Sequence, residues 1–174
     1  MQLLSKCILL ATLGIILAGC VGNHILSNDA VQVSHTAAEI ADFDLPAGYG
    51  ADFSATVMGY TMAAYRHEDG RSHLYLIQSH DATKGETLDA RLDELSAGRR
   101  DEYARMTTIE TRPTRVRGQE ATLVISEGSN SEDMAYRQAT AAFQGKNGPA
   151  LLVLSEPLSR WDEERVNEFV ASLR

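Results

Sequence analysis

The chain has 174 residues, 24 of them acidic and 16 basic, which gives a formal net charge of −8 at pH 7. Nucleic acid and anionic lipid headgroups repel a chain with this charge, so we expect the folded domain to bind neither. The chain has only two cysteines, Cys7 and Cys20, which are too few for a disulfide framework. A stable fold therefore has to rest on its hydrophobic core.

Residues 1–19 have the pattern of an export signal. Lys6 provides a positive start, an apolar run of about ten residues ends at Leu17, and the small residues Ala18 and Gly19 follow. The run is shorter than the roughly 20 residues that a membrane-spanning helix needs. These features taken alone also fit an ordinary secretory signal, whose cleavage would release a soluble protein.

The segment Leu17-Ala18-Gly19-Cys20 resembles the lipobox of bacterial lipoproteins. A thiolate is a strong nucleophile near neutral pH and can take a diacylglyceryl group as a thioether. The resemblance implies cleavage before Cys20, lipidation of Cys20 and anchoring to a membrane through acyl chains. Because Val21 and not aspartate follows the cysteine, the family's sorting rule implies the outer membrane, facing the periplasm. In a source with one membrane, the protein would lie on the outer face of the plasma membrane.

Cleavage would leave one domain and a tether. Removing 19 of the 174 residues leaves 155, and the loss of Lys6 changes the net charge from −8 to −9. We expect residues 20–38 to be the lipidated cysteine and a flexible tether, because they are polar with little apolar periodicity. An alternative is that this stretch threads to a partner. Residues 39–174 are then expected to form a single domain.

Most of this domain has the local patterns of β-strands. Asp69-Gly70 between the β-prone stretches 55–66 and 72–80 predicts a hairpin. Further strands are expected at 107–112, 114–117, 121–126, 136–143 and 151–154. Pro113 indicates an edge or a bend, and the apolar run at 151–154 indicates a buried strand.

Two stretches have helical periodicity instead. One is 81–98, and the other follows Ser159, the expected cap of a helix at the end of the chain. Their apolar stripes are Leu88, Leu92 and Leu95 in the first, and Val166, Phe169, Val170 and Leu173 in the second. We therefore predict an α+β fold, in which two amphipathic helices pack on a twisted antiparallel sheet of about five to seven strands.

Three segments of this domain resemble the PsbP-like domains. They are Phe43-Asp44-Leu45-Pro46-Ala47-Gly48-Tyr49, Arg117-Gly118-Gln119-Glu120-Ala121 and Phe169-Val170-Ala171-Ser172-Leu173. The resemblance extends over about residues 43–173 and rests on loose structural motifs. It implies an α+β binding or assembly module, and it transfers no catalytic or ligand-binding residue to this chain.

The sequence contains no motif of a known catalytic centre. H-E-x-x-H, G-x-S-x-G, the P-loop and C-x-x-C are all missing, so we predict neither a cofactor nor an enzymatic activity. His67 and His73 are weak candidates for metal binding, because the expected hairpin could bring them together beside its acidic turn. Zinc needs three or four ligands, and the alternative is a pair of exposed histidines.

A cluster of basic residues offers a second weak site. Arg112, Arg115 and Arg117 concentrate positive charge in an acidic chain and could bind an anion or a partner. The alternative is a solvated strand face, on which Glu110 and Glu120 balance the arginines.

These observations favour a membrane-anchored cell-envelope lipoprotein that acts as a protein-interaction or assembly module. The expected partners are the membrane, through the acyl chains on Cys20, and an envelope protein of unknown identity; nucleic acid is not expected. One alternative is a carrier that holds a small or apolar ligand in a cleft between the sheet and the helices. Another is an envelope hydrolase, which would need a buried histidine beside a serine or an acid.

Overall fold

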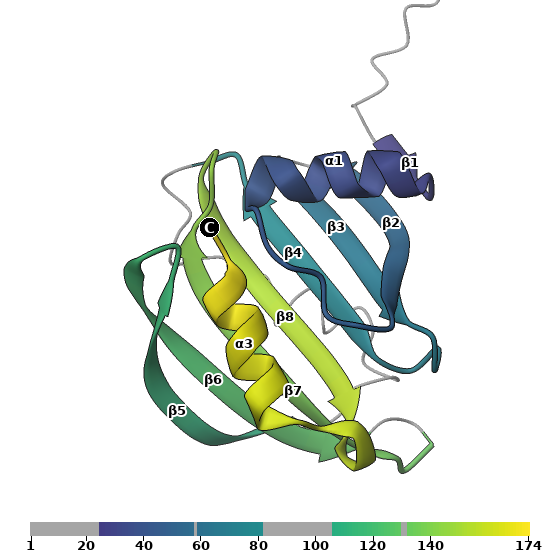
Figure 1. Ribbon diagram of the computed structural model, residues 1–174, viewed down its shortest axis with the longest axis vertical. Coiled ribbons are helices and arrows are strands. Elements are labelled where there is room, and N and C mark those ends of the chain that lie inside the picture. The colour runs from purple at the N-terminus through teal and green to yellow at the C-terminus, as the bar shows by residue number, and fades with distance from the viewer. Residues whose placement is uncertain (1–24, 58, 82–105, 130–131) are drawn as a thin grey trace, which may run out of the picture.

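The computed structural model describes residues 25–57, 59–81, 106–129 and 132–174. These residues form one antiparallel sheet of eight strands in the order β1-β2-β3-β4-β8-β7-β6-β5 (Figure 1). The strands are β1 (Ile25–Ser27), β2 (Tyr49–Val57), β3 (Tyr60–His67), β4 (His73–Ser79), β5 (Thr107–Val116), β6 (Gln119–Ser129), β7 (Ala135–Gln144) and β8 (Pro149–Pro157).

The prediction of a sheet with five to seven strands is wrong, because the sheet has eight. The predicted strand at 55–66 is the end of β2 and most of β3, joined by a turn at Gly59 with a φ of +83°. The neighbours of this glycine in the sequence are apolar, and neither Asn nor Asp precedes it, so the usual hairpin signal is missing. The three-residue strand β1 is too short for any alternation to show.

Residues 25–38, expected to be a flexible tether, contain β1 and most of the helix α1 (Ala30–Ile40). Asp29 caps this helix by accepting a 2.9 Å hydrogen bond from the N–H of Gln32. Val33, Ala37 and Ile40 are buried at i, i+4 and i+7, which is one helical stripe. The small and polar residues between them mask this stripe in the sequence.

The predicted helix at the end of the chain is confirmed as α3 (Glu163–Ser172). Its cap is Asp162, whose carboxylate accepts from the N–H groups of Glu164 and Arg165, whereas Ser159 lies in the short 3₁₀ helix η2 (Leu158–Arg160). The other predicted helix, at 81–98, falls almost entirely outside the described residues.

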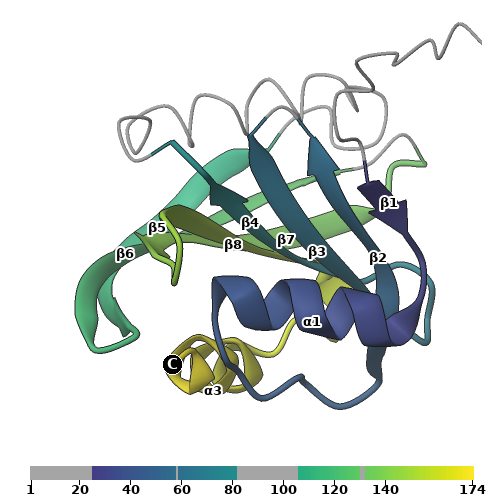
Figure 2. The ribbon, with the colours of Figure 1, turned by 90° about the horizontal axis from the view of Figure 1, so that it is seen from above.

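Both described α-helices lie on the same face of the sheet, here called the helix face (Figure 2). Buried residues of α1 and α3 join those of the strands in one cluster, which includes Val33, Phe169 and Leu154. The opposite face, called the back face, has a smaller cluster around Leu151 and Val153. The central strand β8 is therefore buried on both faces, as its apolar run predicts.

The three segments that resemble PsbP-like domains contact one another around the end of α3. The ring of Phe43 packs edge-to-face on that of Phe169 at 5.7 Å, and the N–H of Arg117 donates to the carbonyl of Leu173 at 3.2 Å. The backbone of Arg174 exchanges two hydrogen bonds with that of Asp42. These segments thus close the end of the chain onto the domain, which is a structural role.

Candidate functional site

Cys20, the predicted lipidation site, lies outside the described residues, so its lipidation stays a prediction. The first strand of the fold, β1, begins at Ile25, five positions after Cys20, so the folded domain starts close to the predicted lipidation site in the sequence. Within the described ranges, no helix is both long and apolar enough to cross a membrane.

The two candidate metal ligands lie on opposite faces of the sheet. In the β3–β4 ladder His73 is opposite Arg66, which places His67, the next residue on β3, on the other face. His67 packs against the ring of Tyr49 on the helix face, and His73 stacks on Tyr75, which packs on the back-face cluster. The two imidazoles would have come together only if His67, and not Arg66, were opposite His73 in the ladder. In the part of the chain that the structure describes, no group of three His, Cys, Asp or Glu side chains is placed to hold a metal ion.

The three candidate arginines are likewise separated. Arg112 reaches α3, where it bonds to Glu163 and, at 2.7 Å, to Asn167, and it also bonds to Glu110 on its own strand. The hydrogen bond to Glu163 and the charge of Glu110 raise the pKa of this guanidinium. Arg112 therefore fastens the edge strand β5 to a helix, and both of its terminal nitrogens are engaged.

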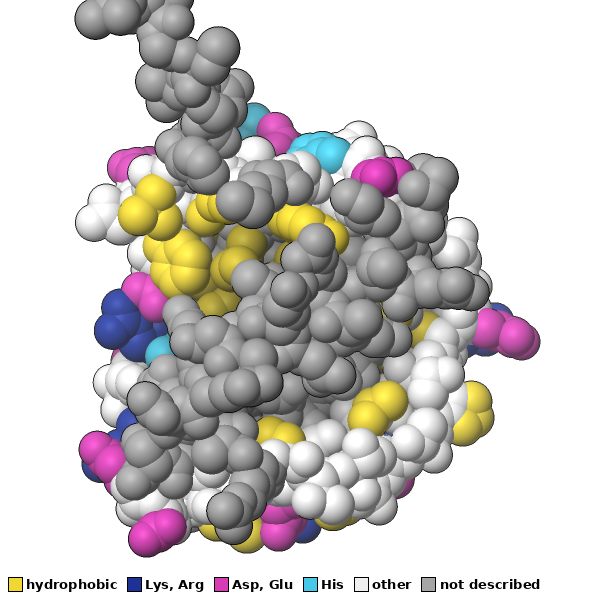
Figure 3. Space-filling view, turned by 180° about the vertical axis from the view of Figure 1, so that it is seen from behind, with side chains coloured by type: hydrophobic (Ala, Val, Ile, Leu, Met, Phe, Trp, Pro, Cys, Tyr) yellow, Lys and Arg dark blue, Asp and Glu magenta, His cyan; other side chains and the backbone are white. Residues whose placement is uncertain are grey.

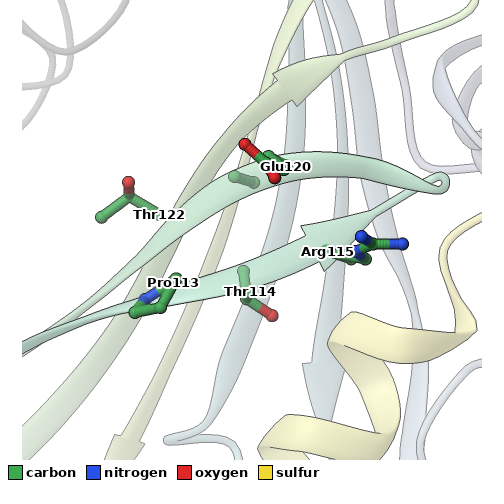
Figure 4. A pocket seen from close by; sticks show the side chains of 6 residues that line it. Pro113, Thr114, Arg115, Glu120 and Thr122 are labelled. Carbon is green, nitrogen blue, oxygen red and sulfur yellow. The ribbon is translucent and has the colours of Figure 1, made fainter.

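Arg115 and Arg117 differ from Arg112 in their surroundings. Arg117 sits in the β5–β6 turn at a φ of +52° and donates to the carbonyl of Gln144 at 2.7 Å. Arg115 is exposed and lies opposite Glu120 in the ladder. An open depression of about 560 Å³ on this hairpin is lined by Pro113, Thr114, Arg115, Glu120, Ala121 and Thr122 (Figure 4). The arginines share no common anion-binding face.

A partly buried polar network, which sequence reasoning missed, lies at the other end of the sheet. Glu156 on β8 is fully buried, and its carboxylate accepts a 2.7 Å hydrogen bond from the hydroxyl of Tyr49. Arg165 of α3 donates to the second carboxylate oxygen and, at 2.9 Å, to the carbonyl of Arg160. Burial and the hydrogen bond to Glu156 raise the pKa of Tyr49 well above its usual range. This phenol therefore stays protonated and acts as a donor.

Arg160 continues the network into the β3–β4 turn. Its Nε lies 3.0 Å from Oδ2 of Asp69, and its Nη2 lies 3.0 Å from Nε2 of His67. The backbone N–H of Asp69 points at the other ring nitrogen of His67, also at 3.0 Å. Both ring nitrogens thus face N–H donors, and a neutral imidazole has one lone pair to offer, so only one of these hydrogen bonds forms at a time.

Asp69 is the best-bonded carboxylate of the network. Burial alone would raise its pKa, but hydrogen bonds from the N–H groups of Arg71 and Ser72 and from the Ser72 hydroxyl outweigh it, and the pKa falls to about 2. The hydroxyl of Ser72 points at Asp69 and not at His67. These contacts therefore hold the turn in place, and they pair the serine hydroxyl with a carboxylate and not with an imidazole.

We call these residues the polar end of the sheet: Tyr49, His67, Asp69, Ser72, Glu156, Arg160 and Arg165. One signal in the sequence points to it, because Glu156 continues the alternation of Leu152 and Leu154 and so has to face the core. An acid at such a position requires a buried partner, but the sequence does not reveal which residue that is.

A search of protein-family models found no match to this chain, and a search of curated proteins found none either. The resemblance to PsbP-like domains stays a prediction.

Proposed function

We propose that this protein is a lipid-anchored lipoprotein of the cell envelope, and that its domain is a protein-interaction or assembly module without catalytic activity. The anchor would be Cys20, and the membrane would be the outer membrane facing the periplasm. The partner would be another envelope protein.

One observation carries the interaction module: the long strand β5 forms an edge of the sheet. It has ten residues, pairs with β6 alone among the described strands, and most of its side chains are exposed, including Ile109 at 50%. An edge strand can pair with an extended segment of another chain. Pro113 and the charged residues on this strand limit unspecific pairing, which suits a surface that binds one partner.

The placement of the other side chains supports the same proposal. Arg112, Asp69 and Glu156 are each engaged in contacts that hold elements together. A carrier would need a cavity between the sheet and the helices. The depression on the β5–β6 hairpin lies elsewhere, and it is open and lined partly by charged residues.

Site-specific photo-crosslinking in living cells tests the proposal. A photo-reactive residue at Ile109 is compared with one at Glu164, which is exposed on α3, and each is placed in the native chain and in the Cys20→Ala variant. We expect one envelope protein to be captured from position 109 of the anchored chain, and not from position 164. Equal capture from both positions, or a small molecule that co-purifies with both chains, would contradict the module.

A further inference from the structure

We propose that the domain contacts the lipid surface through one uncharged corner of its sheet, formed by β1 and the β2–β3 turn. This inference rests on the proposed lipidation of Cys20. It adds an orientation to that anchor, since one end of the sheet faces the membrane and the polar end points away from it.

The first argument is the length of chain between the proposed anchor and the fold. Five residue steps separate Cys20 from Ile25, and five steps can span at most about 18 Å even when fully extended. The headgroup region of one leaflet takes up roughly 6 Å of that length. The start of β1 is therefore held close to the lipid surface, whatever path the intervening residues take.

The register of the sheet shows which part of the domain this is. Ile25 is opposite Thr56 in the β1–β2 ladder, so the chain enters the sheet beside the β2–β3 turn. The polar end, which contains His67 at the far end of β3, lies about 23 Å away for a strand of this length. The anchor thus leaves the domain at the end opposite to the buried network.

The composition of this corner fits a lipid surface. From Phe53 to Tyr65 there is no charged residue, although 23% of the chain is charged. Leu26 is opposite Ala55, and Val57 is opposite Tyr60, so all four are on the back face. Leu26 is 74% exposed and Val57 is 38% exposed. We call these four residues the apolar corner.

The surface view agrees with this register. Hydrophobic side chains gather at the upper left of the back face, on the side of the molecule that carries β1 and β2 (Figure 3). Exposed leucine and valine next to a lipid anchor can enter the headgroup boundary, where burial of apolar area is favourable. The net charge of −9 that cleavage leaves opposes approach to anionic headgroups, and the four residues of the apolar corner add no charge to that repulsion.

The test uses the full lipidated protein in phosphatidylcholine vesicles. Cys7 leaves with the signal and Cys20 is blocked by its thioether, so an introduced cysteine is the only free thiol. An NBD fluorophore is attached at Val57→Cys, at Leu26→Cys, and at the control Glu68→Cys, which is exposed in the β3–β4 turn. Each protein is measured with and without nitroxide-labelled phosphatidylcholine.

We expect blue-shifted emission and loss of most of the fluorescence at positions 57 and 26, and neither change at position 68. Equal emission at all three positions, in protein that floats with the vesicles, would overturn the orientation and leave the anchor standing. A blue shift at 57 without nitroxide quenching would overturn the lipid contact and assign the corner to a second copy of the chain. An N-terminal peptide without acyl mass, in protein that does not float, would overturn the anchor and the inference with it.

Discussion

The two ends of the β2–β3 strand pair differ in almost every physical respect. At one end, Tyr49 and His67 belong to a buried network of carboxylates and guanidinium groups that ties β8, η2 and α3 to the β3–β4 turn. At the other end, Val57 and Tyr60 lie opposite each other next to the β2–β3 turn, in a stretch without a charged residue. Side-chain hydrogen bonds and ion pairs join the elements at the first end, whereas Leu26 is 74% exposed at the second.

The two ends are therefore expected to contribute differently to the stability of the fold. Buried charges are costly unless they are paired, so the polar end exists only because its members satisfy one another. Exposed apolar side chains on a strand contribute little to folding. The polar end should therefore respond strongly to substitution, and the apolar corner should not.

The largest effect is expected from Glu156→Gln. This change leaves the guanidinium of Arg165 without its carboxylate in a largely buried site, and we expect the free energy of unfolding to fall by about 3 kcal/mol. Urea denaturation of the Cys20→Ala chain measures it. The control is Glu127→Gln, which removes a half-exposed partner of Arg137 and should cost about 0.5 kcal/mol. Equal losses in the two variants would show that the buried network is not what stabilises this end.

The next effect compares two glycines with almost the same backbone. Gly48, at the polar end, has a φ of +82°, and a Cβ there would clash with Nε2 of His67. Gly59, in the β2–β3 turn, has a φ of +83° and nothing within 4 Å of such a Cβ. We expect Gly59→Ala to cost about 1 kcal/mol for the left-handed backbone alone. Gly48→Ala should cost about 2 kcal/mol, because the imidazole must also move.

Thermal unfolding measures the stability of the two glycine variants. Because the two glycines share a backbone conformation, a difference in stability between the variants reports the space around each position. A Gly59→Ala variant as unstable as Gly48→Ala would mean that the β2–β3 turn is packed more tightly than its open surroundings indicate.

The same contrast explains what the sequence could and could not predict. The hairpin at Asp69-Gly70, the edge position of Pro113 and the buried strand β8 follow from local patterns. The turn at Gly59 and the helix α1 do not: neither Asn nor Asp precedes Gly59, and small and polar residues mask the buried stripe of α1 even though Asp29 provides a cap.

The polar end escapes sequence reasoning for another reason. Tyr49 and Glu156 bond across 107 positions, and Arg160 and His67 bond across 93. No spacing rule connects residues so far apart. The spacing of His67 and His73 does not show which face of the sheet each residue takes, because the register of the hairpin decides that. The lipobox lies outside the described residues, so the predicted lipidation of Cys20 stays a prediction.

A smaller effect is expected from Asp69, and it depends on pH. The pKa of this carboxyl in the folded chain is about 2, below its ordinary value of 3.8, so its contribution is present above pH 4 and is lost as the pH falls towards 2. In Asp69→Asn the amide oxygen can still accept from the turn, and the loss at pH 7 should be about 1 kcal/mol. Urea denaturation of both chains between pH 7 and pH 2 should show the difference shrinking below pH 4. A constant difference would assign the effect to packing and not to charge.

The smallest effect is expected at the N-terminal edge, where two valines of the same helix provide a matched pair. Val31 is 78% exposed and Val33 is fully buried. Val31→Ser, like Leu26→Ser in the apolar corner, should change the free energy of unfolding of the Cys20→Ala chain by less than about 0.5 kcal/mol. Val33→Ser should cost about 2 kcal/mol, because it buries a hydroxyl and leaves a cavity.

A null result at Leu26 has a consequence beyond stability. If the folded domain in solution gains nothing from an exposed leucine, that leucine is explained by what it meets when the protein is in place. Its closeness to the start of β1, and hence to the proposed anchor, makes lipid the nearest apolar surface. A large loss of stability in Leu26→Ser would instead mean that the corner is part of the folding core, and it would remove the reason to expect lipid there.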